Sequence, residues 1–196
     1  MKRMLLSILL SWPVPLGAQD ARLQRLDPAL AALVQAQLDS ARAADLPTEP
    51  LVQKALEGRG KGAAADRIVG AVRALRLGLE SARWTLGSGA TAPEIIAASN
   101  ALRAGASRAN ITDIRRGREG PVQVPLDVLT DLIARGIPTA AAAAAVERLV
   151  RQGTEDREFL LLRQRVEQDI RAGAAPGLAL ERRLAGIPAA GPPRTP

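Results

Sequence analysis

The chain has 196 residues, of which 47% are apolar and 24% charged, and its formal net charge is +7. It contains no Cys and no His, which excludes disulfides, thiol nucleophiles, thiolate or imidazole metal ligands and the commonest general base. With no Tyr, one Phe and two Trp, a core must be built from aliphatic side chains, and an Ala- and Leu-rich chain favours helices over strands. We therefore expect an all-α protein.

Residues 1–18 have the three parts of a secretory signal peptide. Lys2 and Arg3 form a basic start, an apolar stretch follows, and Ala18 offers a cleavage site, with cleavage after Gln19 as the alternative. The apolar stretch is shorter than the roughly 20 residues that a membrane-spanning helix needs. We expect a cleaved signal, a mature chain without a transmembrane segment, and export to the periplasm or the extracellular space.

Helix signals begin at Asp27, which can cap a first turn that opens with a Pro. Apolar residues then recur at helical spacing over 28–46, 49–57 and 64–83. In the third segment the apolar stripe consists of Ile68, Val72, Leu75 and Leu79. Trp84 follows this stripe and precedes a Gly-Ser-Gly loop.

A capping box opens the next helix, because Thr91 precedes Glu94 by three residues with a Pro between them. A short helix is expected at 109–114 and a loop at 115–125. Apolar spacing then predicts helices at about 125–135, 140–152, 155–172 and 176–185, for about eight in all, with Thr139 and Thr154 as caps. Residues 186–196 are Pro-rich, carry no apolar stripe and are expected to be a disordered tail.

Four glycines, Gly62, Gly105, Gly136 and Gly173, each follow the last turn of an expected helix. We expect them in the left-handed conformation that ends many helices. Two interpretations of residues 19–185 stay open: an irregular bundle whose helices are separated by Gly and Pro residues, or a short array of helix-turn-helix hairpins. The glycines are unevenly spaced, which favours the irregular bundle.

Catalytic candidates are scarce. The acidic clusters at 155–158 and 167–169 are flanked by Arg and suit helix starts and ion pairs one turn apart. We predict no enzyme, no catalytic residue, no cofactor and no metal site, and a carboxylate-based hydrolase is the least favoured alternative.

Two features could bind a partner. Arg115, Arg116 and Arg118 form the densest basic segment, which is either a solvated loop or a contact for an anionic polymer or lipid. No nucleic acid is expected, because no aromatic residues accompany these arginines. Trp84 is either an exposed anchor for a partner or a filler between Ala-rich helices, and its large area favours the filler.

The sequence thus favours a non-catalytic, exported protein–protein interaction or scaffolding module of the bacterial envelope, with another envelope protein as its partner. The alternative is a binder of anionic envelope polymer or lipid through the Arg-rich segment. No motif in the chain identifies the partner.

Overall fold

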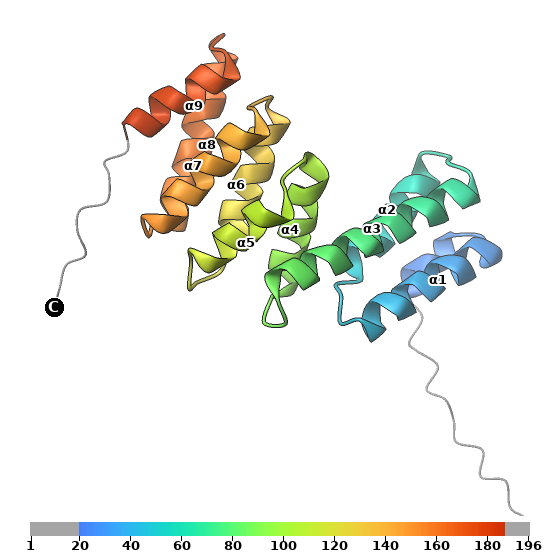
Figure 1. Cartoon of the computed structure of the whole chain (residues 1–196). Coiled ribbons are helices and arrows are strands. Elements are labelled where there is room, and N and C mark those ends of the chain that lie inside the picture. Colours follow the sequence, from blue (N-terminus) through green and yellow to red (C-terminus); the bar gives the residue numbers. More distant parts are fainter. Residues whose placement is uncertain (1–19, 187–196) are drawn as a thin grey trace, which may run out of the picture.

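A computed structural model describes residues 20–186, and this part of the chain is all-helical, with no β-strand among the described residues (Figure 1). It contains the 3₁₀ turn η1 (Ala21–Arg25) and nine α-helices: α1 (Pro28–Ala43), α2 (Glu49–Gly60), α3 (Ala65–Leu86), α4 (Ala92–Ala104), α5 (Arg108–Arg116), α6 (Gln123–Ala134), α7 (Thr139–Arg151), α8 (Asp156–Arg171) and α9 (Pro176–Ala185). The predicted all-α class is confirmed. The predicted signal peptide, 1–18, and nearly all of the predicted tail lie outside the described residues.

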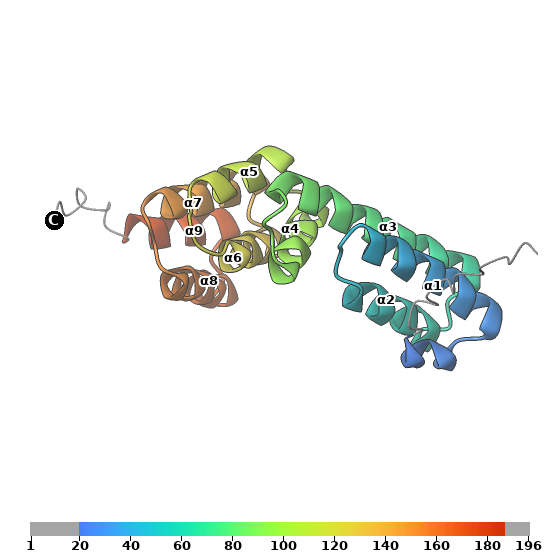
Figure 2. The same cartoon turned by 90° about the horizontal axis from the view of Figure 1, so that it is seen from below.

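The helices form an elongated molecule whose two ends are η1–α1 and α9 (Figures 1 and 2). Beyond α3, alternate helices pack on each other: α4 contacts α6 and α6 contacts α8 in one row, while α3, α5, α7 and α9 contact in sequence in a second row. Helices α1 and α2 both pack on α3. With 22 residues, α3 is about 33 Å long and belongs both to this first group and to the second row.

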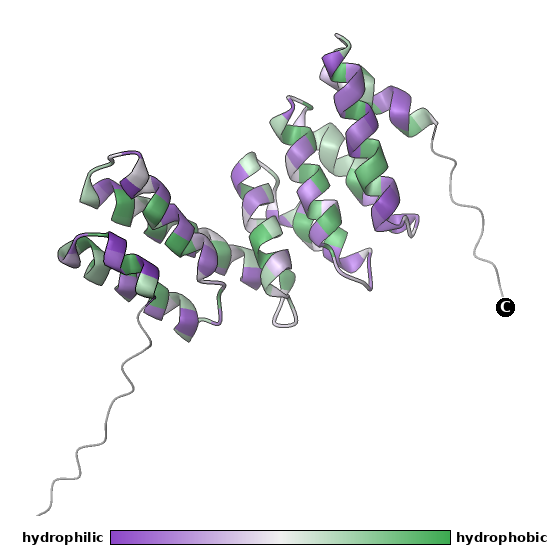
Figure 3. Cartoon of the chain, turned by 180° about the vertical axis from the view of Figure 1, so that it is seen from behind, coloured by the Kyte–Doolittle hydropathy of each residue, from purple (hydrophilic) through white to green (hydrophobic). Residues whose placement is uncertain are grey.

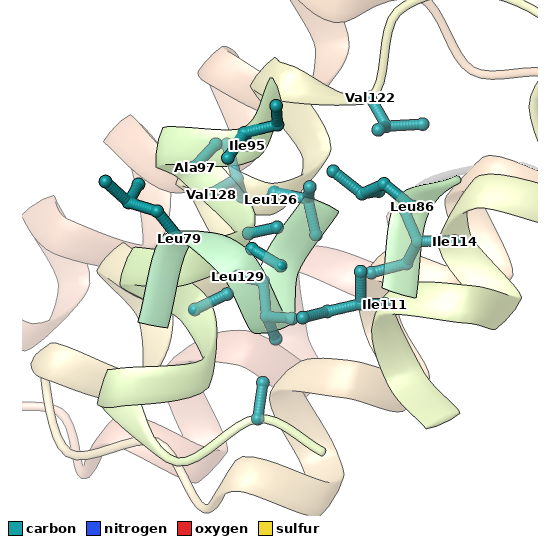
Figure 4. Packing of buried hydrophobic residues seen from close by; sticks show 14 of the residues in the cluster. Leu79, Leu86, Ile95, Ala97, Ile111, Ile114, Val122, Leu126, Val128 and Leu129 are labelled. Carbon is teal, nitrogen blue, oxygen red and sulfur yellow. The ribbon is translucent and has the colours of Figure 1, made fainter. Parts of the chain in front are cut away.

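Most helices carry polar residues on one side and apolar residues on the other (Figure 3). The apolar sides meet in a continuous core of Leu, Val, Ile and Ala, to which Phe159 adds the one buried aromatic ring of the described chain. Figure 4 shows the part of this core where α3, α4, α5 and α6 converge, and these helices contribute the buried side chains of Leu79, Ile95, Ile111 and Leu126 in turn. Aliphatic side chains therefore suffice for this core, as the composition predicts.

The four predicted glycine turns are confirmed. Gly62, Gly105, Gly136 and Gly173 have φ angles of 68°, 111°, 84° and 94°. After each glycine, the next backbone N–H donates to the carbonyl five residues earlier, as in Ala106 to Ala101 at 3.0 Å. The four turns join α2 to α3, α4 to α5, α6 to α7 and α8 to α9. Gly153 and Asp45 end α7 and α1 in the same way, so the turn marks helix ends in general.

The predicted caps have mixed outcomes. Asp27 accepts the backbone N–H of Leu30 at 3.0 Å, and the box between Thr91 and Glu94 forms, so both of these predictions are confirmed. The predictions for Thr139 and Thr154 are wrong. Thr139 is the first residue of α7, and Thr154 precedes Glu155, the residue next to α8. A cap must lie immediately before the first helical residue, and each of these helices begins one position away from the expected place.

Candidate functional site

The loop that contains the Arg-rich segment is shorter than the sequence predicted. The expected loop at 115–125 is too long at both ends, because Arg115 and Arg116 belong to the last turn of α5 and α6 begins at Gln123. Apolar anchors explain the difference: Ile114 and Val122 are both fully buried and hold the two helix ends close together.

Arg115 points into the protein rather than into solvent. Its guanidinium donates to the Glu94 carboxylate at 3.1 Å and to the backbone carbonyls of Arg118 and Gly120, the latter at 2.8 Å. Three acceptors of the same chain thus engage this side chain, and they tie the end of α5 to the start of α4.

Arg118 is also engaged inside the molecule. It donates to the Asp156 carboxylate at 2.6 Å and to the Thr154 carbonyl at 3.1 Å, and it lies 5.8 Å from the centre of the Phe159 ring. Arg116, by contrast, is exposed. The structure therefore does not bring the three predicted anion contacts together on one surface, and only Arg116 presents its charge to solvent without such partners in the described chain.

Glu94 is the acidic counterpart of this cluster and is only 4% exposed. Its carboxylate accepts from the backbone N–H of Val122 at 3.0 Å, from the Thr91 N–H at 2.9 Å and from the Thr91 hydroxyl at 2.8 Å. Burial raises the pKa of Glu94, but the hydrogen bonds from Thr91 and Val122 and the charge of Arg115 outweigh it and leave the pKa below its ordinary value. The sequence revealed the cap but not the partners from α5 and Val122.

Trp84 is the clearest correction to the sequence analysis. The favoured interpretation, a ring that fills a gap between helices, is wrong, because Trp84 is 76% exposed. The guanidinium of Arg108, the first residue of α5, lies over the Trp84 ring at 5.5 Å from the ring centre. The side chain therefore stands on the surface of the second row of helices, where α3 meets α5.

Trp84 ends a stripe along the outer side of α3, which we call the α3 stripe and define as Arg73, Leu77, Glu80 and Trp84. Successive residues turn about 100° around a helix, so these four lie within about 60° of one another. Leu77 is 51% exposed, and it lies about 200° around the helix from Leu75 of the buried stripe. The spacing of Leu75 and Leu77 is a signal in the sequence that places Leu77 outside the core.

A third exposed apolar side chain lies beside the stripe. The amide oxygen of Gln37 in α1 accepts from Arg76 of α3 at 3.2 Å, and Asp45 pairs with Arg83 at 2.8 Å, so α1 and α3 run side by side in one direction. Leu33 is one turn before Gln37 on the same side of α1 and is 53% exposed. Three of the five large apolar side chains that are exposed in the described chain, Leu33, Leu77 and Trp84, therefore belong to these two neighbouring helices.

A concavity of about 560 Å³ lies at the other side of α1, against η1. Its walls include Leu23, Ala31, Ala32 and Gln35, and the Gln35 amide oxygen is buried without a hydrogen-bond partner in the described chain. The amide nitrogen of the same side chain donates to Asp39 at 2.8 Å. Asp20 and Asp39 also line the concavity, whose wall is otherwise mostly apolar.

The acidic clusters pair with arginines of other helices. Asp156 pairs with Arg118, Glu167 pairs with Arg135 at 3.0 Å, and Asp169 pairs with Arg183 at 2.5 Å. Nowhere in the described part of the chain do three or more acidic side chains gather so that they could hold a metal ion. These carboxylates join helices to one another, which accounts for their places in the sequence.

No helix between residues 20 and 186 has both the length and the hydrophobicity needed to cross a bilayer. Comparison of the chain with protein-family models, with curated proteins and with solved structures finds no match. The α3 stripe, Arg108 and Leu33 together present exposed apolar side chains next to exposed charges.

Proposed function

We propose that this chain is a non-catalytic protein–protein interaction module, and that it binds its partner through the α3 stripe and Arg108. The observation that supports the proposal is the 76% exposure of Trp84 under an arginine, with Leu77 two turns away on the same side. Trp and Arg are among the residue types that contribute most binding energy in protein interfaces. The exposed apolar ring is unfavourably hydrated, and burial against a partner would remove that free-energy cost.

The proposal includes an exported chain that works at the bacterial envelope, because residues 1–18 have the composition of a signal peptide. It also includes the arrangement of α4–α9 as a short array of helical hairpins. Helical arrays of this kind expose long continuous surfaces, and the contacts of α3, α5, α7 and α9 in sequence support such an arrangement. Binding of anionic polymer or lipid through the Arg-rich segment has less support, because Arg115 and Arg118 already bond within the chain.

The proposal is tested by expressing the tagged full chain in its source cells and purifying it with whatever protein binds to it. The wild type is compared with Trp84→Ala and with Leu178→Ala, a matched control because Leu178 is 54% exposed on α9, far along the molecule from α3. We expect one stoichiometric protein to accompany the wild type and the control and to be lost with Trp84→Ala. Recovery of the same proteins with all three chains would refute the proposal.

A further inference from the structure

The α3 stripe carries positive charge that the described chain does not neutralise. Arg73 and Arg108 have no carboxylate within ion-pair distance among residues 20–186, and the contact of Arg108 is with the Trp84 ring. The neighbouring Arg76 and Arg83 differ, because they pair with Glu80 at 3.2 Å and with Asp45 at 2.8 Å. The two ends of the stripe are therefore basic, while its middle is locally neutral.

The apolar groups lie between these two charges. Arg73 and Trp84 are separated by about 16 Å along the helix axis, and Leu77 and Trp84 by about 10 Å. An extended peptide advances about 3.3 Å per residue, so five residues span the stripe. Two carboxylates about five residues apart would reach the two arginines, and an apolar side chain between them would contact Leu77 and Trp84.

We propose that the α3 stripe and Arg108 bind an acidic segment of a partner protein, with an apolar side chain at its centre and a carboxylate toward each end. This inference rests on the proposed function and specifies its partner. The segment supplies the negative charge that Arg73 and Arg108 lack, and its central side chain covers Leu77 and Trp84. Charged ends around an apolar centre also match the usual anatomy of a specific interface.

Glu80 favours a protein segment over a polyanion or a membrane. Its side chain is 53% exposed and lies on the stripe between Leu77 and Trp84. Because Arg76 already neutralises this carboxylate, a polymer or lipid surface with evenly spaced negative charge would gain no attraction at the middle of the stripe. A peptide with a neutral centre matches this neutral middle, and its backbone N–H groups can donate to Glu80.

The test is selection of displayed random peptides on the immobilised full chain, followed by affinity measurements with the enriched peptide made synthetically. Four proteins are compared: the wild type, Trp84→Ala, the charge reversal Arg73→Glu/Arg108→Glu, and the control reversal Arg148→Glu/Arg157→Glu. The control arginines are exposed on α7 and α8 and have no ion pair in the described chain. Far-ultraviolet circular dichroism of each variant verifies that it is folded.

We expect enriched peptides with a net negative charge and an apolar centre. Their affinity should fall about tenfold or more with Trp84→Ala and with the Arg73/Arg108 reversal, and change less than about twofold with the control reversal. It should also fall as NaCl rises from about 50 to about 500 mM, because the carboxylates are screened.

Enrichment of neutral or basic peptides, or equal affinity for all four proteins, would overturn the inference. A third result would also overturn it: no peptide is enriched, and the protein is retained on polyphosphate or anionic vesicles only when Arg73 and Arg108 are present. These failures differ from failure of the proposed function. A protein partner lost with Trp84→Ala but kept in the Arg73/Arg108 reversal would leave the interaction module standing and refute only its acidic partner.

Discussion

The Glu94 carboxylate accepts a hydrogen bond from the backbone N–H of Val122 at 3.0 Å, across 28 positions of the chain. Because the same carboxylate also accepts from Thr91 and from Arg115, it joins the start of α4, the end of α5 and the approach to α6. One acidic side chain thus fixes three helices of the core.

Glu94→Gln should lower the free energy of unfolding by about 2 kcal/mol, because a charge that accepts several hydrogen bonds in a buried place is removed. Urea unfolding followed by far-ultraviolet circular dichroism measures this difference. Glu119→Gln, in the neighbouring turn, is the control, since Glu119 is exposed and its charge should contribute little. Equal unfolding midpoints for the wild type and Glu94→Gln would contradict the role given to Glu94.

Acid should destabilise the protein partly through Glu94. The pKa of this carboxyl is lower in the folded chain than its ordinary value of 4.5, so its contribution is present above about pH 4.5 and is lost as the pH falls through the folded pKa. Asp20, whose hydrogen bonds with Arg22 lower its pKa to about 2, adds to the loss of stability in acid. Thermal melts from pH 7 to pH 2 should show a shallower fall for Glu94→Gln than for the wild type. Parallel curves would exclude Glu94 as a source of the acid sensitivity.

Two glycines should respond to alanine with opposite signs. Gly62 ends α2 with a φ of 68°, where a side chain is strained even though the space around it is open, so Gly62→Ala should destabilise the protein by about 1 kcal/mol. Gly70 lies inside α3 with open space at its Cβ position, so Gly70→Ala should stabilise it by about 0.5–1 kcal/mol. Chemical unfolding of both variants measures the pair. The same sign for both changes would contradict the left-handed turn at Gly62.

The arginines of the α5–α6 connection should differ in their effect on stability. Arg118→Gln removes the pair with Asp156 and the contact with the Phe159 ring, and should cost about 1 kcal/mol. Arg116→Gln changes an exposed side chain and should change stability by less than about 0.5 kcal/mol. Thermal melts at equal protein concentration compare the two. A larger loss for Arg116→Gln would mean that its charge also has a structural partner.

Local signals in the sequence were sufficient to predict most of the secondary structure. Asp27, Thr91 and the four turn glycines act through atoms only a few residues away, so their effects could be read from neighbouring positions. The predictions for Thr139 and Thr154 failed because a cap depends on the exact first residue of a helix, and each helix begins one residue away from the place that its apolar spacing predicts.

The sequence by itself determined the all-helical class, the left-handed glycine turns and an aliphatic core, because propensity, local hydrogen bonding and composition decide these features. Only the tertiary structure decided which charges and rings are available to a partner. Arg115 and Arg118 bond to groups 21 and 38 positions away, and Trp84 lies against Arg108 of another helix. Exposure and ion pairing depend on which helices become neighbours, and that depends on the packing of the whole chain.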